Sequence, residues 1–184
     1  KKNSDYSFNK FHSQKKNQSI IFFAITSLHD QGFIRKGYSI SIFKNIISSL
    51  RKNFPNHLIL IKPHPTTNLV ELNDLIKNEI NIEITFLHPS IISRHSEFFI
   101  CDLFSTVTTD AHFLGLTTIE YTIYDDKTLE LIGKKSIGNE FVDYFIHEDV
   151  KELDDLFKKE FIKKNKIDFT EKSEDNKLIN KLIL

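Results

Sequence analysis

The chain of 184 residues contains no methionine, no tryptophan and a single cysteine, and it has no long apolar run. The lone Cys101 excludes a disulfide within the chain and is compatible with a reducing compartment. No apolar stretch reaches the roughly 20 residues that a membrane-spanning helix needs, and no signal-peptide pattern opens the sequence. Because a complete translation product begins with methionine, we expect this chain to be a fragment or the later part of a longer polypeptide.

The sequence also lacks an excess of either charge. Lys plus Arg and Asp plus Glu each number 25, so no net field favours a nucleic acid, and we expect no nucleic-acid partner. Residues 1–18 are polar without a period, which predicts a linker or the tail of a missing preceding domain. We expect one domain over 19–165 and a C-terminal extension over 166–184, ending in a helix across 177–184.

Apolar runs alternate with segments of helical spacing along the predicted domain. Strands that are apolar throughout, separated by helices, predict a parallel sheet covered on both faces, which is a Rossmann-like α/β fold. In such a sheet the ligand crevice lies outside the carboxyl ends of the strands. The predicted strands are 19–27, 57–65, 82–89, 98–105 and 117–124; the predicted helices are 38–54, 68–78, a short one through Ile91 and Ile92, 106–115 and 148–164.

The second predicted strand ends in an unusual corner, "IKPHPTTN" over 61–68. Proline has no N–H to give to a sheet and fixes its own φ, so Pro63 and Pro65 make the strand end a rigid turn. The turn presents His64 and Lys62 at the expected ligand edge, where an imidazole donates hydrogen bonds and an ammonium adds a point charge. A surface or capping histidine is the alternative interpretation of His64.

The fourth predicted strand runs through "FICDLFSTVTTDAHFLG" into a helix. Ser105, Thr106, Thr108 and Thr109 put four hydroxyls at the start of that helix. A helix N-terminus carries unpaired N–H groups and partial positive charge, so the segment is a candidate phosphate cradle. Ordinary helix capping by Ser and Thr is the alternative.

Other polar residues fall at the same predicted edge. Arg35, in the loop after the first strand, could pair with a phosphate, and Glu120, in the fifth strand, could contact a sugar hydroxyl. A solvated polar loop is the alternative interpretation of Arg35, and a polar residue at a strand end is the alternative interpretation of Glu120. We expect no metal site, because the histidines lack ligand spacing, only one cysteine is present and no Asp-x-Asp signature occurs. Cys101 lies within a predicted buried strand and is expected to be inert.

Together, the His-Pro corner and the Ser/Thr helix start resemble the donor-binding half of a GT-B glycosyltransferase. The resemblance covers roughly 57–122 and is similar to bacterial enzymes of capsule and lipopolysaccharide synthesis: sialyltransferases, Kdo-transferase-like proteins and CDP-glycerol glycerophosphotransferases. It implies that His64, Ser105 and Thr106 hold the nucleotide and its phosphate, and that Asp110 orients the loop or meets a sugar hydroxyl. The Leu-Gly-x-Pro turn of such families reads Leu-Gly-Leu-Thr over 114–117, without the proline.

The resemblance further implies an enzyme that transfers a sugar from a CMP-, CDP- or UDP-linked donor to a glycan or lipid-linked acceptor. The nucleotide-sugar is its substrate, and no separate cofactor is implied. Its acceptor domain, with the general base, would precede this segment as a missing N-terminal domain. The implied location is cytoplasmic or peripheral at the inner face of the membrane. A UDP-N-acetylglucosamine 2-epimerase-like enzyme, or a non-catalytic nucleotide-binding or docking module, remains an alternative.

Overall fold

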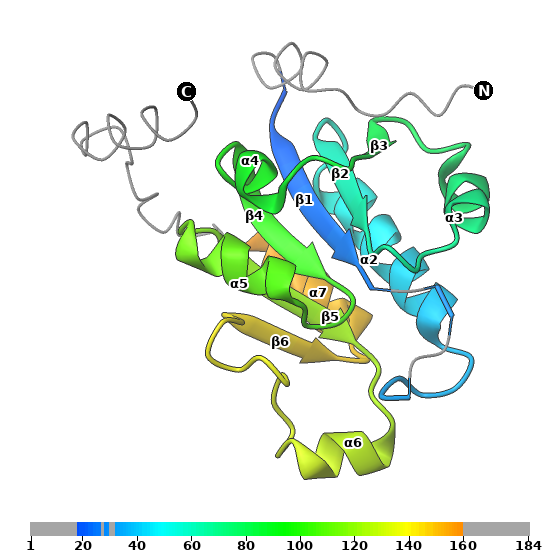
Figure 1. Cartoon of the computed structure of the whole chain (residues 1–184), viewed down its shortest axis with the longest axis vertical. Helices are drawn as coiled ribbons and strands as arrows, with labels where there is room; N and C mark the ends of the chain where they lie inside the picture. Colours follow the sequence, from blue (N-terminus) through cyan, green and yellow to red (C-terminus); the bar gives the residue numbers. More distant parts are fainter. Residues whose placement is uncertain (1–17, 27, 30–31, 160–184) are drawn as a thin grey trace, which may run out of the picture.

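The computed structural model describes residues 18–26, 28–29 and 32–159. They form an α/β unit in which strands and helices alternate along the chain (Figure 1). The strands are β1 Ile20–Ile25, β2 Leu58–Pro63, β3 Ile82–Ile84, β4 Ser96–Cys101, β5 Thr117–Thr122 and β6 Tyr144–His147. The helices are α2 Ser39–Asn53, α3 Leu69–Ile76, α4 Pro89–Ser93, α5 Thr106–Phe113, α6 Asp126–Leu131 and α7 Val150–Lys158.

The strands form one six-stranded sheet in the order β3-β2-β1-β4-β5-β6, and every pairing is parallel. The chain first winds outward from β1 to β3 and then crosses to β4 on the other side of β1. The strand order therefore reverses between β1 and β4. In doubly wound sheets this switch point opens a crevice at the carboxyl ends of the strands, because the connections on its two sides leave in opposite directions.

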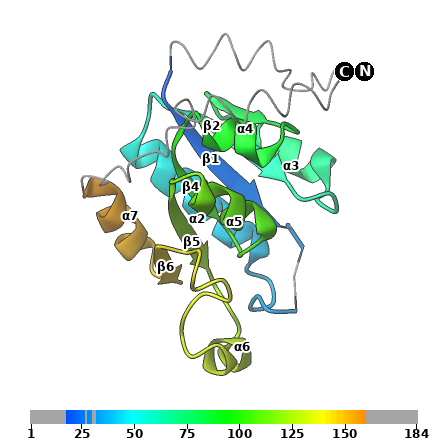
Figure 2. The same cartoon turned by 60° about the vertical axis from the view of Figure 1, so that its left-hand side comes forward.

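The side chains of β1 explain why helices cover both faces. Ile21, Phe23 and Ile25 belong to one apolar cluster, and the alternate residues Ile20 and Phe22 belong to another. Successive side chains of a strand point to opposite faces, so a strand that is apolar at every position has to be covered on both. The helices α2 and α7 pack together on the first face, and α4 and α5 pack together on the second (Figures 1 and 2).

The prediction of a Rossmann-like parallel sheet with helices on both faces is confirmed. Each of the five predicted strands is present, and Gly115, with φ 77°, ends the turn after α5 as a left-handed residue. The sequence patterns missed α6 and β6, because α6 has no buried residue and β6 has only one, so neither carries a buried apolar pattern. None of the described helices combines the length and the hydrophobicity that a membrane span requires. The predicted linker over 1–18 falls almost wholly outside the described residues, and the extension over 166–184 and its helix fall there entirely.

Candidate functional site

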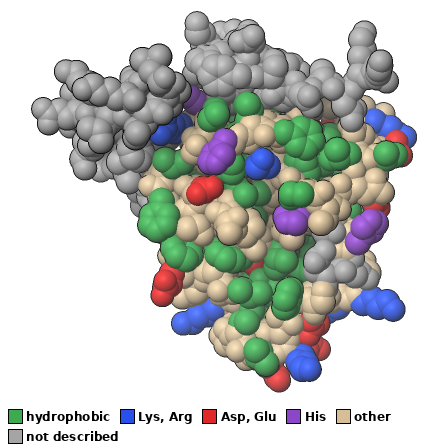
Figure 3. All heavy atoms as spheres, in the orientation of Figure 1, with side chains coloured by type: hydrophobic (Ala, Val, Ile, Leu, Met, Phe, Trp, Pro, Cys, Tyr) green, Lys and Arg blue, Asp and Glu red, His purple; other side chains and the backbone are tan. Residues whose placement is uncertain are grey.

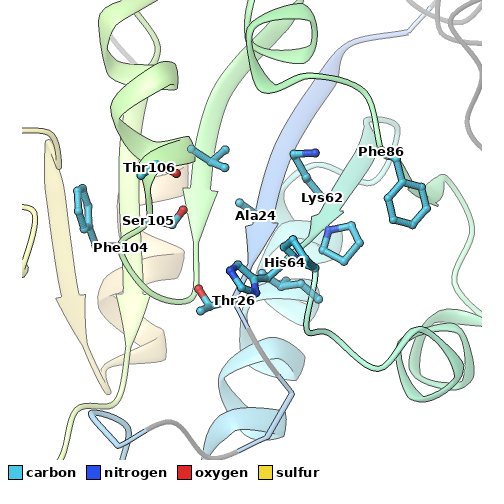
Figure 4. A pocket seen from close by; sticks show the side chains of 12 residues that line it. Ala24, Thr26, Lys62, His64, Phe86, Phe104, Ser105 and Thr106 are labelled. Atoms are coloured by element: carbon cyan, nitrogen blue, oxygen red, sulfur yellow. The ribbon is translucent and has the colours of Figure 1, made fainter.

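A cavity of about 680 Å³ lies at the switch point of the sheet. Its walls come from the carboxyl ends of β1 and β2, from the segment after β3 and from the turn between β4 and α5 (Figure 4). The volume is within the range of roughly 300–1,000 Å³ that is common for small-molecule sites. The lining residues are Ala24, Ile25, Thr26, Lys62, Pro63, His64, Pro65, Phe86, Phe104, Ser105, Thr106 and Val107.

The His64 side chain has its ring orientation fixed by its own turn. Its Nδ1 lies 2.8 Å from Thr66 Oγ1 and accepts the Thr66 backbone N–H at 3.3 Å. An Nδ1 that accepts an N–H carries no proton, so the neutral ring holds its proton on Nε2. The backbone of the corner is held as well, because the His64 N–H donates to Ile25 O at 3.0 Å. The corner therefore brings an imidazole with an Nε2–H donor to the cavity wall.

Lys62 contributes an ammonium from the end of β2. It lies in the register of Leu58 and Leu60, which point to the α4 and α5 face of the sheet. Its Nζ donates to Leu87 O at 3.1 Å, and partial burial lowers the pKa of the Lys62 ammonium below its ordinary value. An ammonium has three N–H donors, so this bond leaves others for a bound group.

The N-terminus of α5 forms the opposite wall. Ser105 is the N-cap in an extended conformation (φ −147°, ψ 171°), and its backbone N–H donates to Thr108 Oγ1 at 3.3 Å. Within the part of the chain that the structure describes, the N–H groups of Thr106 and Val107 have no acceptor. Such N–H groups and the adjacent helix dipole favour an anion. Thr108 is fully buried and fixes this turn from behind.

Asp102 lies directly behind the cavity and is not among the site residues predicted from the sequence. It follows β4, is 7% exposed, and its Oδ1 accepts the N–H of the lining residue Thr26 at 2.9 Å. This bond joins the ends of β1 and β4 across the switch point. Burial raises the pKa of the Asp102 carboxyl to about 7, because the charged form loses its hydration there. The sequence feature that could have identified Asp102 is an acidic residue directly after a buried strand.

Four of the predicted site residues line this one cavity: Lys62, His64, Ser105 and Thr106. Their predicted role in holding a ligand stays a prediction. The other four, Thr108, Asp110, Arg35 and Glu120, are not among the lining residues.

Arg35 and Glu120 are committed elsewhere, contrary to the sequence-based expectation. Arg35 pairs with Glu148 at 2.7 Å and with Asp126 at 3.4 Å, so it joins its loop to the start of α6 and the end of β6. Glu120 is fully buried, accepts the Tyr124 hydroxyl at 2.6 Å and also accepts the Ser136 hydroxyl. Side-chain direction decides both cases, because the sequence alone does not fix where the side chain of a loop residue such as Arg35 or a strand residue such as Glu120 points.

Asp110 and Thr108 lie on α5 beyond the cavity wall. The carbonyl of Asp110 accepts the N–H of Leu114 within the helix. Thr108 serves the capping of Ser105 and lies 3.6 Å from Cys101 Sγ. The buried Cys101 has its thiol pKa raised by burial, which is the direction expected of an inert cysteine. Among the described residues, no group of three His, Cys, Asp or Glu side chains is placed to hold a metal ion.

Comparison with known proteins gives a likeness of fold alone. No family model matches the chain, and no curated protein matches it. The structure resembles the crystal structure of phenylacrylic acid decarboxylase from Aquifex aeolicus, with a TM-score of 0.47 and 14% sequence identity. The match covers 78% of this chain and 98% of that chain. At this level of similarity nothing about substrate or chemistry passes to this chain.

These findings correct the glycosyltransferase interpretation. The solved structure named above is that of a decarboxylase and not of a glycosyltransferase. Nothing in the family or curated comparisons supports a GT-B half, a capsule or lipopolysaccharide enzyme, or transfer from a nucleotide-sugar. The interpretation was therefore wrong. Short His-Pro and Ser/Thr motifs occur at strand ends of many parallel sheets because they make turns and helix caps there.

Proposed function

We propose that the cavity binds a small phosphorylated molecule, with its phosphate between the His64 corner and the N-terminus of α5. The observation that supports this is that the polar side chains of the lining can all donate hydrogen bonds and that none of them is a carboxylate. These polar side chains are Thr26, Lys62, His64, Ser105 and Thr106, and the twelve lining residues include no Asp or Glu. Ammonium, imidazole and hydroxyl groups all donate hydrogen bonds, which suits an oxyanion and disfavours a cation.

The donors reach the cavity from separate elements, so the bound group would be contacted on several sides. Lys62 and His64 come from the end of β2 (Figure 4). The free N–H groups of Thr106 and Val107 come from the start of α5. The three terminal oxygens of a phosphate monoester point in different directions from the phosphorus, so they can accept hydrogen bonds from donors on several sides. The lining proline and phenylalanine side chains give the rest of the molecule an apolar surface, as is common in small-molecule sites.

A proline at position 106 tests the role of the backbone directly. Thr106 is the first residue of α5, where proline is well tolerated because its missing N–H would have no helical partner. The extended conformation of Ser105 is also the one that a following proline requires. Thr106→Pro therefore removes one free N–H and the hydroxyl while preserving the helix, and Thr106→Ala removes the hydroxyl alone.

The measurement is calorimetric titration of the 184-residue chain and both variants with inorganic phosphate and with glycerol 3-phosphate. We expect Thr106→Pro to weaken both ligands about tenfold relative to Thr106→Ala, since a hydrogen bond to a charged group contributes about 1.5–3 kcal/mol. Circular dichroism confirms that the helix content is kept. Equal affinities for the two variants, or no phosphate binding by the folded parent chain, would overturn the proposal.

A further inference from the structure

We infer that the phosphorylated ligand carries an apolar group, which occupies a second cavity on the other side of Phe104; this inference rests on the proposed function. The second cavity has a volume of about 510 Å³ and lies between the turn after β4 and α6. Its lining residues are Gly32, Phe33, Leu103, Phe104, Asp125, Lys127, Thr128, Leu131, Ile132 and Ile137.

Phe104 lines both cavities, so it is the wall that they share. It directly precedes Ser105, the N-cap of α5 at the proposed phosphate position. A ligand whose phosphate lies at α5 therefore has the second cavity as its nearest apolar neighbour on that side. Because the two cavities share this residue, we assign the occupant of the second cavity to the same ligand.

The position of Phe104 is fixed by the segment that follows α6. A Cβ placed on Gly138 would lie only 1.9 Å from Phe104 Cδ2, so the ring rests directly on the Gly138 backbone. The ring of Phe104 also stacks on Phe141 at a centroid distance of 6.2 Å. The Gly138 N–H donates to Ser136 Oγ at 3.0 Å, and Ser136 in turn donates to the buried Glu120. The wall between the cavities is therefore tied to β5.

The chemistry of the second cavity is apolar. Leu131, Phe33 and Ile137 are 82%, 51% and 47% exposed, which is unfavourable for large apolar side chains unless something covers them. Two charged residues line the cavity: Asp125 caps α6 by accepting the Thr128 N–H at 2.9 Å, and Lys127 lies in the first turn of α6. Figure 3 shows hydrophobic side chains gathered over the lower part of this face, where α6 lies. An alkyl or aryl group fits the leucine, isoleucine and phenylalanine side chains that make up most of this lining.

Three ligands with one phosphate each test the inference: inorganic phosphate, glycerol 3-phosphate and hexyl phosphate, titrated calorimetrically into the 184-residue chain. We expect hexyl phosphate to bind at least tenfold more tightly than glycerol 3-phosphate. Leu131→Asp should remove most of this difference and leave the affinity for inorganic phosphate unchanged. Val70→Asp is the matched control, because Val70 is 74% exposed and lines neither cavity, and it should change neither affinity.

The outcomes separate this inference from the proposed function. Phosphate binding with no preference for hexyl phosphate, or a preference that Leu131→Asp leaves intact, would overturn the inference alone. Failure of inorganic phosphate to bind would overturn both. Concentration-dependent dimerisation that Leu131→Asp abolishes, measured by sedimentation, would identify a second copy as the occupant and would also overturn the inference.

Discussion

The imidazole rings of His64 and His88 are held by the same pair of contacts. In each case Nδ1 lies 2.8 Å from the hydroxyl of the residue two positions later and accepts that residue's backbone N–H at 3.3 Å. His64-Pro65-Thr66 and His88-Pro89-Ser90 are thus equivalent turns at the ends of neighbouring strands. The two differ in their surroundings: His88 caps α4, whereas only His64 lines the cavity at the switch point.

This equivalence supplies a matched pair of variants. His64→Ala removes the Nε2–H donor, and we expect the affinity for inorganic phosphate to fall about tenfold in calorimetric titration. His88→Ala removes a helix cap, so we expect a loss of about 1 kcal/mol in the free energy of unfolding with unchanged phosphate affinity. If both variants weaken phosphate binding equally, the histidine turn is structural in both places.

Asp102 gives a prediction for the pH dependence of stability. Its pKa is about 7 in the folded chain and near 3.8 when exposed, so between these values the folded state holds a proton that the unfolded state has lost. The Asp102 contribution to stability is therefore present below pH 4 and is lost as pH rises through about 7. Between these two pH values, the free energy of unfolding falls by on the order of 4 kcal/mol.

Asp102→Asn should remove this loss, because the amide oxygen still accepts the Thr26 N–H and no charge is buried. We expect urea titrations at pH 5 and pH 8 to show a smaller fall in unfolding free energy for Asp102→Asn than for the parent chain. Asp155→Asn, at a half-buried position of α7, serves as the control and should keep the steep fall. An identical pH dependence for Asp102→Asn and the parent would show that the carboxyl is not protonated on folding.

Gly138 fixes the wall between the two cavities. Gly138→Ala places a methyl group against the Phe104 ring, so the ring has to move away from its stacked position on Phe141. We expect a loss of about 1–3 kcal/mol in the free energy of unfolding from this overpacking. We also expect altered hexyl phosphate affinity in calorimetry. Gly32→Ala is the control, since a Cβ at Gly32 meets nothing within 4 Å. Unchanged stability for Gly138→Ala would contradict the close approach.

A substitution of Arg35 tests whether this residue lies outside the ligand site, contrary to the sequence-based prediction. Its guanidinium is engaged by Glu148 and Asp126 and does not line the cavity. Arg35→Ala should therefore cause a small fall in Tm, measured by differential scanning calorimetry, because exposed ion pairs contribute little. Phosphate affinity should stay unchanged. A large fall in phosphate affinity at constant stability would restore Arg35 as a ligand-binding residue.

Local sequence patterns were sufficient to predict the fold class and the two chain segments that form opposite walls of the cavity. Every position of β1 is apolar, which predicts a strand buried on both faces without reference to any other part of the chain. The prolines at 63 and 65 mark where β2 ends, and Ser105 marks where α5 begins. Because all strands are parallel, these ends had to fall on one edge of the sheet. The strand β6 was not predicted, since only one of its four residues is buried and a buried apolar pattern is missing.

The sequence by itself determined an alternating α/β chain with a histidine corner and a hydroxyl-rich helix start at the same edge of its sheet. Only the tertiary structure decided that β1 lies between β2 and β4, which brings those two segments to one cavity, buries Asp102 behind it, turns Glu120 into the core and directs Arg35 to Glu148. The physical reason is that periodicity and turn chemistry are local properties. Strand order and the direction of each side chain depend on how every crossover packs against the whole sheet.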